Sequence, residues 1–487
     1  MKNYTNRNFL IILISTILVF SLSSTLYSDL KTGIDQYNKG MIDEAIVTIK
    51  EVTEKKPNDG NAWRWLGFLQ TIKGLYSDAI ISLNKAIELK SDGADTRINL
   101  GFSQSALNND DEAIKNFKKA IEFNPNSADA YYNLGLSQIR LKMMDEALDS
   151  LLKAESLAPN NAKILNNLGF VYQSKNNSDK AVAYYKKAIE IDPTNAEYNT
   201  NLGWILLDKN DIEGAKLAFA TALESDPNLA LANGGMGKVL MAIGDDKAAL
   251  TYFEKALSFD KNNKAALLSV GLINIKLGNY SSAVNNLKLF NTLVSNDSDA
   301  IAYQGWATYK TGSINEAIEL LTKSTQLNDN NLFAWESLAA IYSANDQLDN
   351  AYTVWNKVKQ LNKENYAARI NLGNIYLNKN NILQAIDEYK AAISLNPKPA
   401  EAYFGLAMAY SKQDKIESAI DNFKKAIEAD PKMAIAYNNL GVEYEKQNKM
   451  EEAKAAYRKA LEVDPNNQSA IKNLERHGEQ PGLTQGN

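Results

Sequence analysis

Apolar and small residues recur along most of this chain in two alternating blocks, each with the spacing of one face of a helix. In the segment 434–467 they stand at positions 4, 7, 8 and 11 and again at positions 20, 24 and 27. This spacing predicts two amphipathic helices joined by a short turn. Neighbouring segments repeat the pattern with a period of 34 residues, which predicts a helix–turn–helix repeat.

The repeat keeps one register from residue 26 to residue 467. Thirteen units of 34 residues fill this span without insertion or deletion, beginning at residues 26, 60, 94, 128, 162, 196, 230, 264, 298, 332, 366, 400 and 434. Position 20 is alanine in all thirteen units, position 8 is glycine in eleven, and position 24 is always apolar. Eight of the ten prolines fall at position 32.

These repeated residues have physical roles that together predict an all-α fold. Small residues at positions 8 and 20 let the two helices of a unit approach closely, and proline at position 32 ends the second helix. A single pair of helices cannot bury its apolar face, so neighbouring units are expected to stack. Residues 468–477 resemble half a unit and are expected to form a capping helix, and residues 478–487 are expected to form a disordered tail.

The repeat resembles the tetratricopeptide repeat family. In the segment 128–161 the family's positions are filled by Tyr131, Leu134, Gly135, Ala147, Ala154 and Pro159. The resemblance implies an α-solenoid, a right-handed superhelix of thirteen antiparallel helix pairs plus the capping helix. It also implies that the first helix of each unit lines a concave groove with its positions 2, 5, 6, 9, 12 and 13.

Asparagine occupies groove position 6 in four consecutive units, as Asn99, Asn133, Asn167 and Asn201. An asparagine amide offers two donors and an acceptor, so it can pair with both polar groups of a peptide unit. The row resembles the asparagine ladder in the superhelical repeats of O-linked N-acetylglucosamine transferase, which implies capture of an extended polypeptide. The alternative is that Asn-Leu-Gly is a common helix sequence of the family with no role in binding.

Large apolar residues follow at groove position 9 of the same part of the chain. They are Phe68, Phe102, Phe170 and Trp204, with Leu136 between them. Apolar side chains exposed in a groove would mark a binding surface. The alternative is that these side chains lean back into the packing between repeats. The sequence leaves both interpretations open.

Three further features carry structural expectations. Glutamine replaces the family's tyrosine at position 11 in the first four units, where each amide is expected to bond to the next repeat or to the groove wall. Asp110 and Asp111 lie in a turn and are expected to be solvated. Three glycines between Asn233 and Lys238 predict a soft joint near residue 235, because glycine weakens a helix; a phosphate-binding loop is not indicated there, since the motif is incomplete.

The N-terminus has the pattern of an export signal. Lys2 and Arg7 precede an apolar run from Phe9 to Phe20, and small residues follow it. This arrangement is typical of a signal peptide, so residues 1–25 are expected to be cleaved from an exported, periplasmic or envelope-associated protein. The alternative is a membrane anchor formed by residues 9–26, which would be the chain's one contact with a membrane.

Composition narrows the function. The chain has no cysteine, one histidine (His477) and a net charge of −5, so thiolate chemistry, histidine-based catalysis and a basic nucleic-acid surface all lack their residues. No cofactor or metal is expected. The sequence therefore predicts a non-catalytic scaffold that binds a protein or peptide. The alternatives are the recruiting or regulatory arm of an envelope enzyme assembly and a purely architectural spacer; nothing indicates the oligomeric state.

Overall fold

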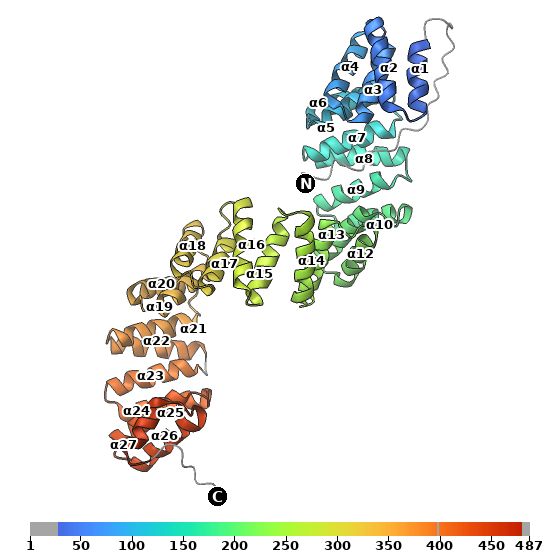
Figure 1. The fold of residues 1–487 in the computed structure, drawn as a ribbon. Coiled ribbons are helices and arrows are strands. Elements are labelled where there is room, and N and C mark those ends of the chain that lie inside the picture. The colour runs from blue at the N-terminus through green and yellow to red at the C-terminus, as the bar shows by residue number, and fades with distance from the viewer. Residues whose placement is uncertain (1–27, 397–398, 480–487) are drawn as a thin grey trace. The chain divides into compact units, whose positions relative to one another are not determined.

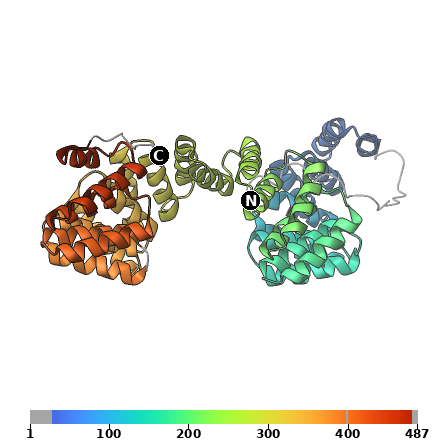
Figure 2. The ribbon, with the colours of Figure 1, turned by 90° about the horizontal axis from the view of Figure 1, so that it is seen from below.

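The computed structural model describes residues 28–396 and 399–479, and this part of the chain holds 27 helices and no strand. The helices form thirteen antiparallel pairs followed by one more helix, as the repeat predicts. They divide into two compact units, one ending at Phe259 and one beginning at Asp260. Within each unit successive pairs stack side by side, as Figures 1 and 2 show.

The first unit contains seven helix pairs. They are α1 (Ser28–Asn38), α2 (Ile42–Lys55), α3 (Gly60–Lys73), α4 (Tyr76–Glu88), α5 (Ala94–Ala106), α6 (Asp110–Phe123), α7 (Ala128–Arg140), α8 (Met144–Leu157), α9 (Ala162–Ser174), α10 (Ser178–Ile191), α11 (Ala196–Asp208), α12 (Ile212–Ser225), α13 (Ala230–Ala242) and α14 (Asp246–Phe259). Each first helix contacts its own second helix and the first helix of the next repeat from α3 through α13.

The second unit contains six helix pairs and a final helix. They are α15 (Lys264–Lys276), α16 (Tyr280–Leu293), α17 (Ser298–Lys310), α18 (Ile314–Leu327), α19 (Leu332–Ala344), α20 (Leu348–Leu361), α21 (Tyr366–Asn378), α22 (Ile382–Leu395), α23 (Ala400–Lys412), α24 (Ile416–Ala429), α25 (Ala434–Lys446), α26 (Met450–Val463) and α27 (Gln468–Arg476).

The core of each repeat forms where position 8 meets position 24. All thirteen alanines at position 20 are fully buried. A Cβ atom added at Gly169 would lie 2.7 Å from the Tyr185 ring, and one at Gly441 would lie 2.5 Å from the Tyr457 ring. The glycine therefore makes room for the large side chain at position 24 of the facing helix. This is a more specific role than the close backbone approach that the sequence suggested.

The turn inside each repeat depends on a left-handed residue at position 15. The backbone φ angle is positive there in all thirteen repeats, and the residue is glycine, asparagine or aspartate in all but one of them. These residues tolerate the left-handed region better than others do. The exception is Lys142, with φ 62°.

Most second helices end at the same place whether or not proline follows. Five repeats lack proline at position 32. One of them, with Ser91 there, ends α4 at position 29, but α14, α16, α18 and α20 of the other four still end at position 30. In three of them the next backbone N–H donates to the carbonyl four residues back, as from Val294 to Phe290. Proline therefore reinforces a stop that the turn geometry already provides.

Helix α13 runs unbroken through its three glycines. A Cβ at Gly235 would lie 2.3 Å from the Phe219 ring, and one at Gly237 would lie 2.8 Å from the Phe253 ring, so both glycines serve packing. The compact units divide after Phe259. This division lies after the helix that follows α13, and the soft joint near residue 235 stays a prediction.

The C-terminal helix α27 covers the end of the second unit with Ala470 and Leu474, while Ile471 is half-buried. Glu479 pairs with Arg458 and Lys454, so the predicted tail is anchored at its start. Its remainder, residues 480–487, and the predicted signal segment 1–25 lie outside the described residues. None of the described helices is long and apolar enough to cross a membrane.

Candidate functional site

The four asparagines of the predicted ladder lie on α5, α7, α9 and α11, the first helices of consecutive repeats. Asn133 and Asn167 are half-buried, and each donates its Nδ2 to the carbonyl four residues earlier, at 2.8 Å. Asn99 makes the same bond to Asp95 but is only 8% exposed. No Oδ1 atom of the four accepts a hydrogen bond from the described residues, so the row keeps its acceptors free.

The asparagines also connect neighbouring repeats, a role that sequence reasoning missed. Nδ2 of Asn201 donates to Oδ1 of Asn166 at 3.0 Å, and Nδ2 of Asn167 lies 3.4 Å from the hydroxyl of Tyr132. The same link recurs in the second unit, from Asn473 to Asn438. Each joins position 6 of one repeat to position 5 of the repeat before it. The recurrence of asparagine at one position was the signal, but it did not identify the partner.

The aromatic residues at position 9 are half-buried, and three of the four contact other rings. Phe68 packs edge-on against Tyr37 and Trp65, with ring centroids 5.4 and 5.5 Å away. Phe102 packs against Tyr76 and Trp204 against Phe219, while no ring contact is found for Phe170 among the described residues. Part of the surface of each of these aromatic side chains is therefore packed within the protein, as the packing alternative expects. The remainder stays open to a ligand.

The glutamines at position 11 bond within their own repeats, unlike the sequence-based expectation. Oε1 of Gln70 accepts from Ser82, that of Gln104 from Asn116 and that of Gln138 from Ser150, at 2.7–2.8 Å. Each donor stands at position 23, so the bond joins the two helices of one repeat. Oε1 of Gln36 is buried without a partner. Position 23 of its unit is Thr48, which does not donate to it.

Asp110 is a second correction, because it is buried and bonded instead of solvated. Its carboxylate is 6% exposed and accepts two hydrogen bonds from Nε and Nη2 of Arg140 and one from the hydroxyl of Ser105. Arg140 comes from the next repeat, so this ion pair joins α6 to α7. A charge buried in this way is maintained by its partners.

The groove face of α5 to α11 perturbs its ionisable groups. Burial raises the pKa of the Asp129 carboxyl, and the nearby Asp95 raises it further. Burial also raises the pKa of Glu197, which Lys163 only partly offsets. Both side chains are exposed, so the desolvation comes from the protein atoms around them and not from complete burial. Burial raises the pKa of the Tyr132 hydroxyl as well.

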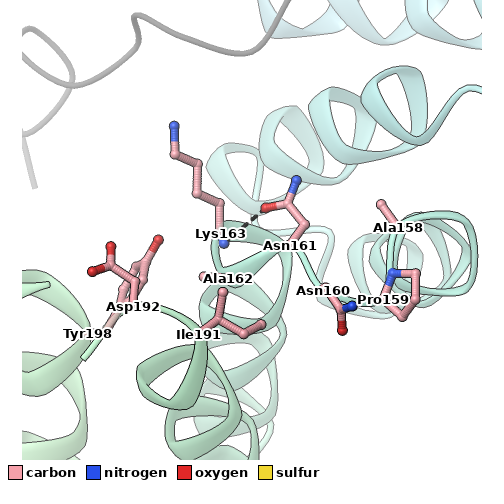
Figure 3. Close-up of a pocket in the computed structure, with 9 residues that line it drawn as sticks. All are labelled: Ala158, Pro159, Asn160, Asn161, Ala162, Lys163, Ile191, Asp192 and Tyr198. Carbon is pink, nitrogen blue, oxygen red and sulfur yellow. Dashed lines mark hydrogen bonds between the residues drawn. The ribbon is translucent and has the colours of Figure 1, made fainter. Parts of the chain in front are cut away.

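An open hollow of about 540 Å³ lies beside this stretch, at the turns that lead into α9 and α11 (Figure 3). Its apolar surface comes from Ala158, Pro159 and Ile191, and its polar groups include Lys163 and Tyr198. Burial, followed by Glu197 and Asp192, raises the pKa of Tyr198 to about 12, so its phenol is neutral at physiological pH. Among the described residues no group of three or more metal-ligating side chains occurs.

Comparison with known protein families agrees with the repeat. Models described as tetratricopeptide repeat match residues 128–161, 162–195, 184–216, 230–263, 400–433 and 434–467, and a model described as TPR repeat matches residues 105–142 and 373–414. Five of these matches begin and end at unit boundaries read from the sequence. The chain belongs to the tetratricopeptide repeat (TPR) family.

Solved structures of several other proteins are similar to this TPR protein. PilF of Pseudomonas aeruginosa is 23% identical, with 44% of this chain and 97% of that one covered and a TM-score of 0.42. Cut9 in the APC/C Cut9–Hcn1 complex is 17% identical, with 93% and 97% covered and a TM-score of 0.41. YrrB, described as a TPR protein with an unusual peptide-binding site, is 22% identical, with 39% and 98% covered and a TM-score of 0.35. No curated protein sequence matches the chain.

Membership of the TPR family carries a general function. TPR proteins mediate protein–protein interactions, and TPR scaffolds are generally non-catalytic. Because a fold does not specify a partner, any finer statement has to come from the groove itself.

Proposed function

We propose that this protein is a non-catalytic scaffold whose first unit holds an extended polypeptide in the groove formed by α3 to α11. The ladder of Asn99, Asn133, Asn167 and Asn201 binds the ligand's backbone. Phe68, Phe102, Phe170 and Trp204 pack against its side chains. The bound segment is recognised mainly by its extended backbone, so many sequences fit.

The observation that carries this proposal is the row of free amide acceptors on consecutive helices. The helices that hold it contact one another in sequence, which supports the proposal that the amides line the groove in one row. Each Oδ1 can accept a backbone N–H of the ligand, and Nδ2 of Asn99, Asn133 and Asn201 retains a second hydrogen beyond its bond within the protein. An extended chain has unpaired backbone groups at regular intervals, which suits such a line.

We further propose that the protein is exported and acts in the cell envelope. The support is the N-terminal sequence, with Lys2 and Arg7 ahead of the apolar run Phe9–Phe20. Mass spectrometry of the native protein tests this proposal. A mature chain that begins close to residue 26 is expected. A chain that keeps Met1 would contradict cleavage and favour the anchor.

The groove proposal is tested with fluorescent peptides of roughly twelve residues, a length that spans several repeats when extended. A peptide, its scrambled sequence and its backbone N-methylated form are compared by anisotropy. The scrambled peptide is expected to bind within about threefold of the parent. The N-methylated form is expected to lose about tenfold or more, because each lost hydrogen bond costs about 1 kcal/mol.

The matching protein variant changes all four ladder asparagines to alanine. It is expected to bind the parent peptide about tenfold or more weakly than the wild type does, for the same reason. Asn286→Ala is the control, because Asn286 is also half-buried and donates to the carbonyl four residues earlier but lies on the second helix α16. Unchanged affinity in a folded ladder variant would rule out the ladder. No binding of any peptide to the wild type would leave the spacer alternative.

A further inference from the structure

Asp95 and Asp129 stand at the same place in consecutive repeats, the second residue of α5 and of α7. These helices contact each other, and both side chains are exposed on the groove face. Neither carboxylate accepts a hydrogen bond or an ion pair from the part of the chain that the structure describes. In the second unit two carboxylates stand at this position, and one of them, Asp299, accepts a hydrogen bond from Nδ2 of Asn331 at 2.9 Å; the other is Glu401 on α23.

The negative charge of this pair is left uncompensated. A carboxylate in the first turn of a helix is normally stabilised by the helix dipole, which lowers its pKa. Burial and the neighbouring Asp95 instead raise the pKa of Asp129. The folded protein therefore bears a free-energy cost whenever Asp129 is ionised, and nothing within the described residues repays it.

The acidic pair is joined to the ladder. The backbone carbonyls of Asp95 and Asp129 accept the Nδ2 hydrogen bonds of Asn99 and Asn133. Asn99 is 8% exposed, and its Oδ1 accepts no hydrogen bond from the described residues, so this acceptor is available to a ligand. A ligand backbone bound by these asparagines would pass one helical turn from the two carboxylates, within reach of a long side chain.

We propose that Asp95 and Asp129 select ligands by charge: the extended polypeptide held by the groove carries a lysine or arginine side chain that lies between these two carboxylates. This inference rests on the proposed function, because the ladder must first hold the backbone. The preference is local, since Lys163 stands at the same position of the next repeat. A peptide with one or two basic residues therefore fits better than a polybasic one.

The experiment uses the full chain and three acetylated peptides of roughly twelve residues that differ only at two central positions, occupied by lysine, glutamine or glutamate. The lysine peptide is expected to bind about tenfold more tightly than the glutamine peptide, and the glutamate peptide more weakly than either. The double substitution Asp95→Asn, Asp129→Asn is expected to remove this order while the glutamine peptide binds as before. Asp149→Asn, an exposed carboxylate on α8, is the matched control and is expected to keep the order.

Stability provides the second readout. If the carboxylates are held for a ligand, the double variant should be as stable as the wild type or more stable, because two unpaired like charges are replaced by neutral amides. A clear loss of stability would assign them a structural role and overturn the proposal. Equal affinity of the wild type for the lysine and glutamine peptides would overturn it too, while leaving the groove function intact. If no peptide binds, both fail.

Discussion

Glycines that lie close together in one helix can have different roles, as the three glycines of α13 show. Gly235 and Gly237 lie against phenylalanine rings, whereas a Cβ atom at Gly234 would meet nothing within 4 Å. Gly234 also has no positive φ angle to accommodate. Among the described glycines within helices, it is the one whose missing side chain neither packing nor backbone geometry explains.

Substitution by alanine should therefore have opposite effects at neighbouring positions. Gly234→Ala is expected to raise the free energy of unfolding by about 0.5–1 kcal/mol, because alanine favours the helix and fits without contact. Gly235→Ala is expected to lower it by about 1–3 kcal/mol, because its Cβ would collide with Phe219. Urea denaturation measures both. A stabilised Gly235→Ala variant would show that the ring moves aside freely.

At the scale of single residues, the sequence shows which polar residues recur but not which residues they bond to. Glutamine at position 11 was recognisable as a repeated exception, yet its hydrogen-bond donor stands twelve or so residues away on the other helix. Only the register between the two helices shows that position 23 faces position 11. Asp110 was misread for the same reason: Arg140, which buries it, lies a repeat away.

At the scale of the element, the turn between the two helices of a repeat is the most constant feature of the chain. Its position-15 residue is left-handed in every repeat, although the amino acid varies. The helices themselves were predictable because a face of apolar residues fixes both their type and their length. The left-handed residue in the turn was not predictable, because glycine, asparagine and aspartate alternate at position 15. They share a backbone conformation but no recurring sequence pattern.

The same turn predicts a stabilising substitution. Lys142 adopts the left-handed region at φ 62°, which costs a residue with a Cβ roughly 1–2 kcal/mol. Lys142→Gly is expected to raise the free energy of unfolding by about 0.5–1 kcal/mol after the added flexibility of the unfolded chain is subtracted. Asn108→Gly, at the same position one repeat earlier, is the control and should change stability by less than about 0.5 kcal/mol. Equal effects would contradict the strain.

At the scale of the whole molecule, a repeat array must cover the apolar face that its last pair leaves exposed. Helix α27 does this with two buried side chains, and one carboxylate anchors its end. Glu445 on α25 accepts hydrogen bonds from Tyr457 on α26, from Arg476 at the end of α27 and from His477 beyond it, at 2.6–2.7 Å. The protein's single histidine, His477, thus helps to hold the cap through its hydrogen bond to Glu445, which the sequence did not predict.

This anchor makes the cap sensitive to acid. Burial alone would raise the pKa of Glu445, but the hydrogen bonds from Tyr457, His477 and Arg476 outweigh it and hold the pKa below its ordinary value. A carboxyl with a lowered pKa in the folded state contributes stability above its ordinary pKa and loses it as the pH falls through the folded value.

Glu445→Gln is therefore expected to speed amide hydrogen exchange in α27 several-fold near pH 6, because it lowers the free energy of local opening by about 1 kcal/mol. The difference from wild type should shrink as the pH falls through the lowered pKa of Glu445, because protonation then removes the wild-type charge. Glu451→Gln, an exposed carboxyl on α26, serves as the control. An undiminished difference at low pH would mean that Glu445 holds the cap by packing and not by charge.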